Sequence, residues 1–97
     1  MTSKQRSYLK GLAMNIDPIF QIGKSSLTPE VTQAVDEALE ARELIKIAIL
    51  KNCVDDGNSI AEVLAERTHA QLVQVIGRKV ILYRPAKDMA KRKIQLP

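Results

Sequence analysis

The sequence predicts a small two-layer α/β domain, in which an N-terminal helix precedes the order βαβαββ and the four strands form one mixed sheet. A length of 97 residues allows one domain with a single modest core. Apolar residues recur at helical spacing in some segments and form β-branched runs in others. Because these two kinds of segment alternate along the chain, they favour a sheet with right-handed crossovers.

The first helix is expected at residues 3–14. Thr2 and Gln5 have the spacing of a capping box, and apolar residues follow at helical spacing. Pro18 disfavours the helical conformation in the residue before it, so the helix must end before this point. Residues 19–22 are rich in large apolar side chains and predict a short strand.

The second helix has the strongest signals in the sequence. Thr28 is a preferred N-cap residue, and Pro29 follows at the first helical position, where an N–H is not needed. From Val31 onward, apolar residues recur at positions i, i+3, i+4, i+7 and i+8. We therefore expect a turn at residues 23–27 and a helix that begins after Thr28.

A buried strand and a third helix are expected next. Residues 44–50 are rich in β-branched side chains, and residues 55–58 form a dense turn signal. Ser59 and Glu62 have the spacing of another capping box. This pattern predicts a helix that begins at Ser59 and runs to about Thr68.

The chain then predicts a β-hairpin. Residues 72–76 and 79–84 are expected as strands, and the two-residue turn between them begins with Gly77, as a type II′ turn requires. Residues 1–85 are thus expected to form a single domain. Residues 86–97 are expected to be a partly ordered basic tail.

One cysteine and one histidine exclude several classes of protein. Cys53 has no partner for an internal disulfide, and with His69 it forms no metal-ligand spacing. The longest apolar runs, such as residues 47–50, contain four residues, which is too short for a membrane span or a signal peptide. The sequence therefore predicts a soluble, cytoplasmic protein that has no membrane partner, metal or other cofactor.

The net charge of +4 is unevenly distributed along the chain. Residues 1–24 carry four basic side chains and one acidic one, and residues 70–97 carry seven and one, whereas residues 25–69 carry four and nine. Basic segments favour an acidic partner, and nucleic acid is the first class to consider. If the two basic ends converge in the fold, they form one cationic surface.

The turn at residues 23–26 has the chemistry of an anion site. Gly23 allows close backbone approach, Lys24 adds a positive charge, and the next helix points its N–H groups and the positive end of its dipole toward the turn. Ser25 and Ser26 complete the turn. The simpler alternative is a turn with a solvated lysine, because the sequence lacks the spacing of a P-loop.

Several separated motifs extend over residues 2–85. They are Thr2 to Lys10, Asp17-Pro18, Gln21 to Lys24, Leu27-Thr28, Glu43 to Lys46, Val73 to Arg78 and Leu82 to Pro85. In this order they resemble the YhbY-like family, the stand-alone bacterial form of the CRM (chloroplast RNA splicing and ribosome maturation) domain. The resemblance implies an RNA-binding domain whose fold is similar to that of the C-terminal domain of bacterial translation initiation factor 3.

Bacterial members of this family associate with precursors of the large ribosomal subunit. The family also has a G-x-x-G loop like that of KH domains, where the loop clamps the nucleotide backbone, and here it corresponds to residues 23–26. Ser26 replaces the second glycine. Either Ser26 is strained at a positive φ, or the turn differs and the hydroxyls of Ser25 and Ser26 donate to phosphate.

Basic residues on the first helix and on the hairpin are further candidates for phosphate contact, and a solvated surface is the alternative for each. The basic tail is expected to add diffuse attraction. Three aromatic residues are too few for a base-stacking platform. The complete set of candidate RNA-binding residues is Gly23, Lys24, Ser25, Ser26, Lys4, Arg6, Lys10, Arg78, Lys79 and Arg84.

These observations favour a non-catalytic RNA-binding protein. We expect it to engage structured ribosomal RNA during assembly of the large subunit, by neutralising phosphates and recognising shape. No nucleophile is matched with a base, so neither an enzyme nor a small-molecule substrate is expected. The alternative function is a protein-interaction adaptor whose partner is a ribosomal protein or an assembly factor.

Overall fold

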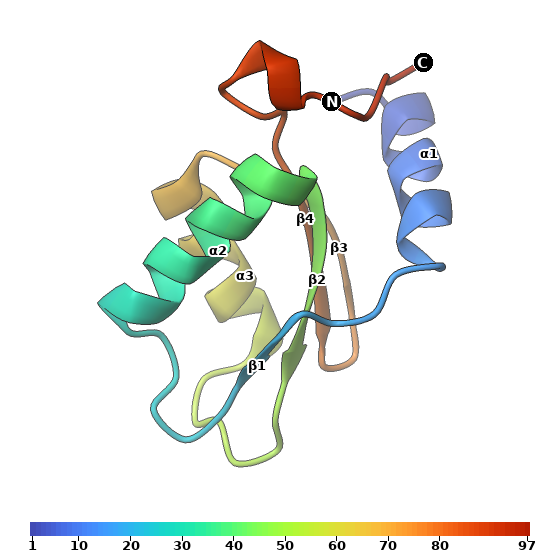
Figure 1. Cartoon of the computed structure of the whole chain (residues 1–97). Helices are drawn as coiled ribbons and strands as arrows, with labels where there is room; N and C mark the ends of the chain where they lie inside the picture. Colours follow the sequence, from blue (N-terminus) through green and yellow to red (C-terminus); the bar gives the residue numbers. More distant parts are fainter.

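One four-stranded mixed sheet, in the order β1-β2-β4-β3, organises all 97 residues of the computed structural model. Helices α2 and α3 cover one face of the sheet and α1 lies on the other (Figure 1). The fold class predicted from the sequence is confirmed. The elements are α1 (Ser3–Ala13), β1 (Phe20–Ile22), α2 (Pro29–Arg42), β2 (Leu44–Ile49), α3 (Gly57–Thr68), β3 (Gln71–Ile76), β4 (Lys79–Tyr83) and a 3-10 turn, η1 (Met89–Lys91).

Strand β2 is central to the sheet and is buried on both faces. It pairs in parallel with β1 and antiparallel with β4, which in turn pairs antiparallel with β3. Ile45, Ile47 and Ile49 point into the core under α2 and α3, whereas Leu44 belongs to the cluster under α1. A strand buried on both faces needs apolar residues at nearly every position, which explains the almost continuous apolar run.

The local signals at the helix ends are confirmed for α1 and α2. Gln5 N–H donates to Thr2 Oγ1 at 3.1 Å, and Thr2 N–H donates to Gln5 Oε1 at 3.1 Å, which completes the capping box. Thr28 Oγ1 accepts from Val31 N–H at 3.2 Å, with Pro29 in the first turn. These interactions involve residues three positions apart, so the sequence alone reveals them.

The predicted start of α3 at Ser59 is wrong. The helix begins at Gly57, and its N-cap is Asp56, whose Oδ1 accepts from Ser59 N–H at 2.8 Å. The Asp56 carboxylate is a charged acceptor beside the positive end of the helix dipole, which favours it over a cap at the Ser59 hydroxyl. The same hydrogen bond, together with the Ser59 hydroxyl, lowers the pKa of Asp56.

The hairpin turn agrees with its predicted geometry. Gly77 has a φ of +55°, and Arg78 is not among the residues with positive φ. A type I′ turn needs positive φ at both positions, so this pattern fits type II′.

Residues 86–97 pack against the domain through a buried carboxylate. Glu43 is 0% exposed, and its side chain accepts the backbone N–H groups of Ala86 at 2.8 Å, Lys93 at 2.6 Å and Ile94 at 2.9 Å. Ile94 and Leu96 pack on the cluster under α1. Burial acts to raise the pKa of Glu43, but these three hydrogen bonds outweigh it, and the pKa is lowered overall.

A second carboxylate, on α2, holds the start of the same segment. Glu40 accepts the N–H groups of Lys87 at 2.7 Å and Asp88 at 3.0 Å, and these bonds lower its pKa. The two chain ends lie side by side, because Gln5 Nε2, on the first helix, donates to Pro97 O at 3.3 Å (Figure 1).

None of the three helices combines the length and the apolar character needed to cross a bilayer.

Replacing the buried carboxylate of Glu43 by an amide of the same shape tests how much it stabilises the packing of residues 86–97. We expect Glu43→Gln to lower the free energy of unfolding at neutral pH by about 2–4 kcal/mol, because an amide N–H would face the N–H donors that the carboxylate accepts. Urea denaturation measures the change. The exposed Glu62→Gln on α3 serves as control and should behave like wild type.

The loss should also depend on pH with a definite sign. Because the folded-state pKa of Glu43 is lowered, its stabilisation is present above the ordinary value of 4.5 and is lost as pH falls through the folded value. The difference between wild type and Glu43→Gln should therefore shrink as pH falls from neutral toward about 3. An equal difference at all pH values would contradict a charged Glu43.

Candidate nucleic-acid interface

Three loops meet at one end of the sheet. Strands β1 and β2 are parallel, so both end there, and Leu50 N–H donates to Ile22 O at 2.8 Å across the two exits. The hairpin joins them through Ile49 N–H, which donates to Arg78 O at 2.7 Å. We call residues 23–28, 50–56 and 77–79 the basic tip, which lies at the opposite end of the sheet from the two chain termini (Figure 1).

The first loop of the basic tip is a tight turn in which Gly23 packs closely against the second loop. Ser26 N–H donates to Gly23 O at 2.9 Å. A Cβ at Gly23 would lie 3.2 Å from Asn52 Oδ1 and 3.4 Å from Leu50 Cδ1, so a side chain there would fit only if these two side chains moved slightly. The N–H groups of Lys24 and Ser25 donate no hydrogen bond within the protein, which leaves both available to an anion.

Ser26 takes the strained conformation. Its φ is +52°, in the left-handed region, where a residue with a side chain is strained by about 1 kcal/mol or more. The Ser26 hydroxyl donates to Asp55 Oδ2 at 2.5 Å and so is already engaged by the second loop. Of the two alternatives for this position, the structure shows the positive φ.

Four exposed basic residues carry the positive charge of the basic tip. Lys24, Arg78 and Lys79 are predicted from the sequence, whereas Lys51 is not. Lys51 follows the end of β2 as Lys24 follows the end of the parallel strand β1, and this shared position is the signal that would have found it. The acidic residues beside these four are Asp55 and Asp56.

The helix dipoles contribute less to this site than the sequence suggests. At α2, Thr28 already accepts from Val31 N–H, Pro29 has no N–H, and Glu30 places a carboxylate in the first turn. At α3, the Asp56 carboxylate occupies the N-terminus. An anion at the basic tip would therefore be held by the side-chain cations and by the free N–H groups of the first loop.

Arg6 does not lie at the basic tip. Its Nη1 donates to Leu72 O at 2.6 Å and to Val73 O at 2.7 Å, at the bulge in the edge strand β3. This arginine joins α1 to the sheet. The same helix carries Lys4, which is exposed in the first turn beside the C-terminus, and the half-buried Lys10 in the last turn.

Arg84 is a buried structural residue. It is 5% exposed, and its Nη1 donates to Asp36 Oδ1 at 2.5 Å and to Thr68 O at 2.9 Å. Its Nη2 lies 3.4 Å from Glu40 Oε1. The guanidinium thus joins the end of β4 to α2 and to the last turn of α3, and it has no donor directed at solvent that would reach RNA. The proposed RNA-binding surface is the basic tip, so we leave out Arg6 and Arg84, and also Lys4 and Lys10, which lie on α1.

The basic ends of the chain therefore converge in two places. Lys24 joins the hairpin at the basic tip, and the first turn of α1 joins the C-terminal segment at the other end (Figure 1). Of the exposed acidic residues of the middle segment, two lie in the basic tip, Asp55 and Asp56, and the others lie on α2 and α3, away from α1. The residues on the helices are Glu30, Glu37, Glu62 and Glu66.

Comparison with known proteins decides the family. Residues 1–84 match the sequence profile of the CRS1/YhbY (CRM) domain. This chain belongs to the CRM domain family. The match ends at Arg84, so it includes every element of the basic tip.

Two relatives of this CRM domain are similar over nearly their full length. The chain is 42% identical to "Probable RNA-binding protein YqeI" of Bacillus subtilis, over 100% of this chain and 99% of the relative. It is 35% identical to "RNA-binding protein" of Haemophilus influenzae, over 100% of this chain and 95% of the relative. The solution structure of the hypothetical protein SAV1595 from Staphylococcus aureus superposes with a TM-score of 0.81 at 47% identity, covering 100% of this chain and 99% of that one.

Replacing arginine by lysine should affect the buried Arg84 and the exposed Arg78 of this CRM domain differently. We expect Arg84→Lys to lower the free energy of unfolding by about 1–3 kcal/mol, because lysine keeps the charge but not the planar fork that bonds two helices. Arg78→Lys, on the exposed hairpin turn, should leave it unchanged. Urea denaturation of both variants gives the comparison, and equal stability would show that the Arg84 network contributes nothing.

Proposed function

We propose that this CRM-domain protein is a non-catalytic RNA-binding protein whose basic tip binds structured ribosomal RNA in precursors of the large ribosomal subunit. The family and the names of its relatives support RNA as the ligand. The observation that carries the proposal is the meeting of three loops that present Lys24, Lys51, Arg78 and Lys79 on one exposed end. We expect the protein to act in the cytoplasm, where such precursors form.

Phosphate contact is the main mechanism that this surface supports. Each cation that meets a phosphate releases a condensed counterion, so affinity comes from several weak contacts and falls with salt. The free N–H groups of Lys24 and Ser25 add short-range donors that suit a phosphate oxygen. Gly23 keeps the backbone close to the surface, as a loop that approaches a nucleotide backbone requires.

Base stacking has little part in this mechanism. Phe20 packs against the core and Tyr83 is 5% exposed, while the exposed Tyr8 lies on α1. Two aliphatic side chains are exposed here: Val54 in the basic tip is 83% exposed, and Ile76, directly before the hairpin turn, is 54% exposed. These can pack on sugars, so recognition depends on the shape and the backbone of the RNA.

A binding series with a charge-reversed variant tests the proposal. The wild-type protein should bind a structured fragment of large-subunit ribosomal RNA more tightly than duplex DNA of equal length, with log affinity falling linearly with log salt. We expect Lys24→Glu to weaken RNA binding by about fivefold or more and to reduce the salt slope by about 1.

The matched control is Lys4→Glu, which makes the same change in net charge on α1. It should change the affinity by less than about twofold. Far-ultraviolet circular dichroism confirms that both variants are folded. Wild-type affinity in folded Lys24→Glu would refute the role of the loop, and equal affinity for RNA and DNA would refute RNA recognition.

The carboxylate of Asp55 should oppose RNA binding, because it lies within the basic tip and is bonded to Ser26. We expect Asp55→Asn to raise RNA affinity by about two- to fivefold at low salt, with the gain vanishing as salt screens the charge. Asparagine retains an oxygen that accepts from Ser26, so the turn is preserved. Glu66→Gln, in a later turn of α3, removes the same charge elsewhere and should have no effect.

A further inference from the structure

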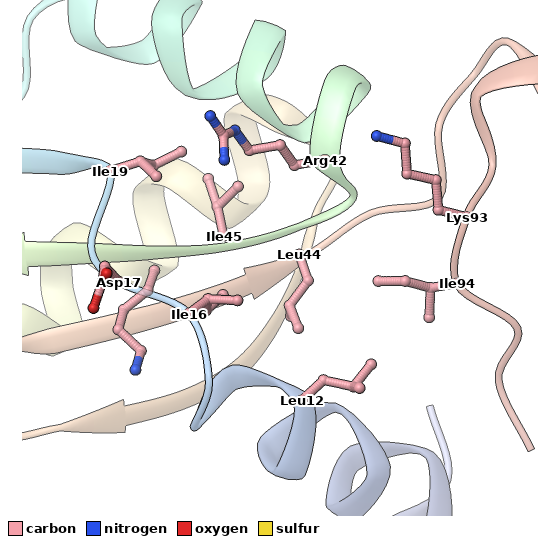
Figure 2. Close-up of a pocket in the computed structure, with 10 residues that line it drawn as sticks. Leu12, Ile16, Asp17, Ile19, Arg42, Leu44, Ile45, Lys93 and Ile94 are labelled. Atoms are coloured by element: carbon pink, nitrogen blue, oxygen red, sulfur yellow. The ribbon is translucent and has the colours of Figure 1, made fainter.

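A groove separate from the basic tip lies between α1, the start of β2 and the C-terminal segment (Figure 2). Its volume is about 530 Å³, within the range of ligand-binding sites. Six of its ten lining residues are apolar, and Leu12, Ile16, Leu44 and Ile94 face one another across it. Leu12, Ile16 and Ile94 are only partly buried, so the domain leaves apolar surface open here.

The rim of the groove carries unbalanced positive charge. Arg42, Lys46 and Lys93 line it together with a single acid, Asp17. Both ion pairs of the protein belong to Arg84, so none of these three cations has a carboxylate oxygen within 4.0 Å of its nitrogen atoms. A ligand that carries carboxylates next to apolar groups would complement both the rim and the walls.

We propose that this groove is a docking site for an acidic protein segment, a short peptide whose large apolar side chains enter the groove while flanking Asp or Glu residues meet Arg42, Lys46 and Lys93. Apolar anchors in a groove with charges beside them are a common mode of peptide recognition. The proposal is independent of RNA binding at the basic tip.

The composition of the groove favours a peptide over RNA as the occupant. Its walls are aliphatic, and none of the three aromatic residues of the chain lines it, so a base would find no stacking partner. An aliphatic peptide side chain loses no hydrogen bond when it enters such walls, whereas a base edge would leave polar groups unpaired.

The position of the groove allows both ligands to bind together. It is lined by Leu44, Ile45 and Lys46 at the start of β2, whereas the basic tip begins after Ile49 at the end of that strand. Three strand residues, 47–49, separate Lys46 in the groove from Leu50 in the basic tip, which is about 13 Å of strand. A domain that bound RNA at one end and an acidic segment at the other would link the two partners.

The test uses two fluorescein-labelled peptides of about twelve residues composed of Leu and Glu, with the leucines at helical spacing in one and alternating in the other. Fluorescence anisotropy measures their binding to the full-length protein at low salt. We expect at least one to bind in the micromolar range, with affinity falling as salt rises. A peptide in which Lys replaces every Glu should not bind.

Two variants place the binding in the groove. Arg42→Gln combined with Lys93→Gln should weaken peptide binding about five- to tenfold, and Leu12→Gln should weaken it by at least as much. Lys24→Glu, at the basic tip, should leave it unchanged. Urea denaturation checks that each variant is folded. The two variants change the charged rim and the apolar wall separately, so if one fails to fold, the other still tests the groove.

Several results would overturn the proposal. One is that neither acidic peptide binds below about 1 mM, or that the groove variants bind as wild type does. Another is that single-stranded RNA displaces the peptide and that the Arg42 and Lys93 variant loses RNA affinity, which would make RNA the occupant. A third is a dimer in sedimentation that Leu12→Gln dissociates, which would make a second copy the occupant.

Discussion

The buried carboxylate of Glu43 connects parts of the fold that are distant in the sequence. It accepts the N–H groups of Ala86, Lys93 and Ile94, which lie 43 to 51 residues further along the chain. Its own backbone connects the end of α2 with the end of β4, because Glu43 O accepts from Arg84 N–H at 2.9 Å. Since a buried charge is stable only when it is fully hydrogen-bonded, these contacts form together. One wall of the groove, Ile94, is therefore in place only while Glu43 is charged and bonded.

Strand β2 separates two surfaces that suit different partners. Glu43 stands directly before its first residue, and the groove lies at that end, where apolar side chains alternate with free cations. The basic tip lies beyond its last residue, where loops present cations and unpaired N–H groups. A strand buried on both faces is among the most rigid parts of a domain, so it fixes the spacing between the two surfaces. Function is thus carried by loops and edges that a rigid centre positions.

Local signals predicted the elements well, whereas long-range contacts decided which charges are exposed. The caps at Thr2 and Thr28 depend on residues three positions away, and both were predicted correctly. The cap predicted at Ser59 was wrong, because Ser59 N–H instead donates to the carboxylate of Asp56, three residues earlier. Whether Arg84 faces RNA or the interior depends on Asp36, which is 48 residues away. Lys51 was missed for the same reason, because its place beside Lys24 follows from the parallel register of β1 and β2.

The contact between Ser26 and Asp55 shows how order and affinity compete at the basic tip. A positive φ strains Ser26, and its hydroxyl bond to a carboxylate helps to hold that conformation. This bond also joins the first loop to the second, so both loops are ordered before RNA arrives, which lowers the entropy cost of binding. The same carboxylate would repel the phosphates that Lys24 is proposed to attract. A glycine at position 26 would remove the strain and the need for the bond, but it would leave the loop freer in the unbound protein. Asp55 would therefore act on RNA affinity in two opposing ways. Its hydrogen bond to Ser26 orders the loop before binding, whereas its negative charge repels phosphate.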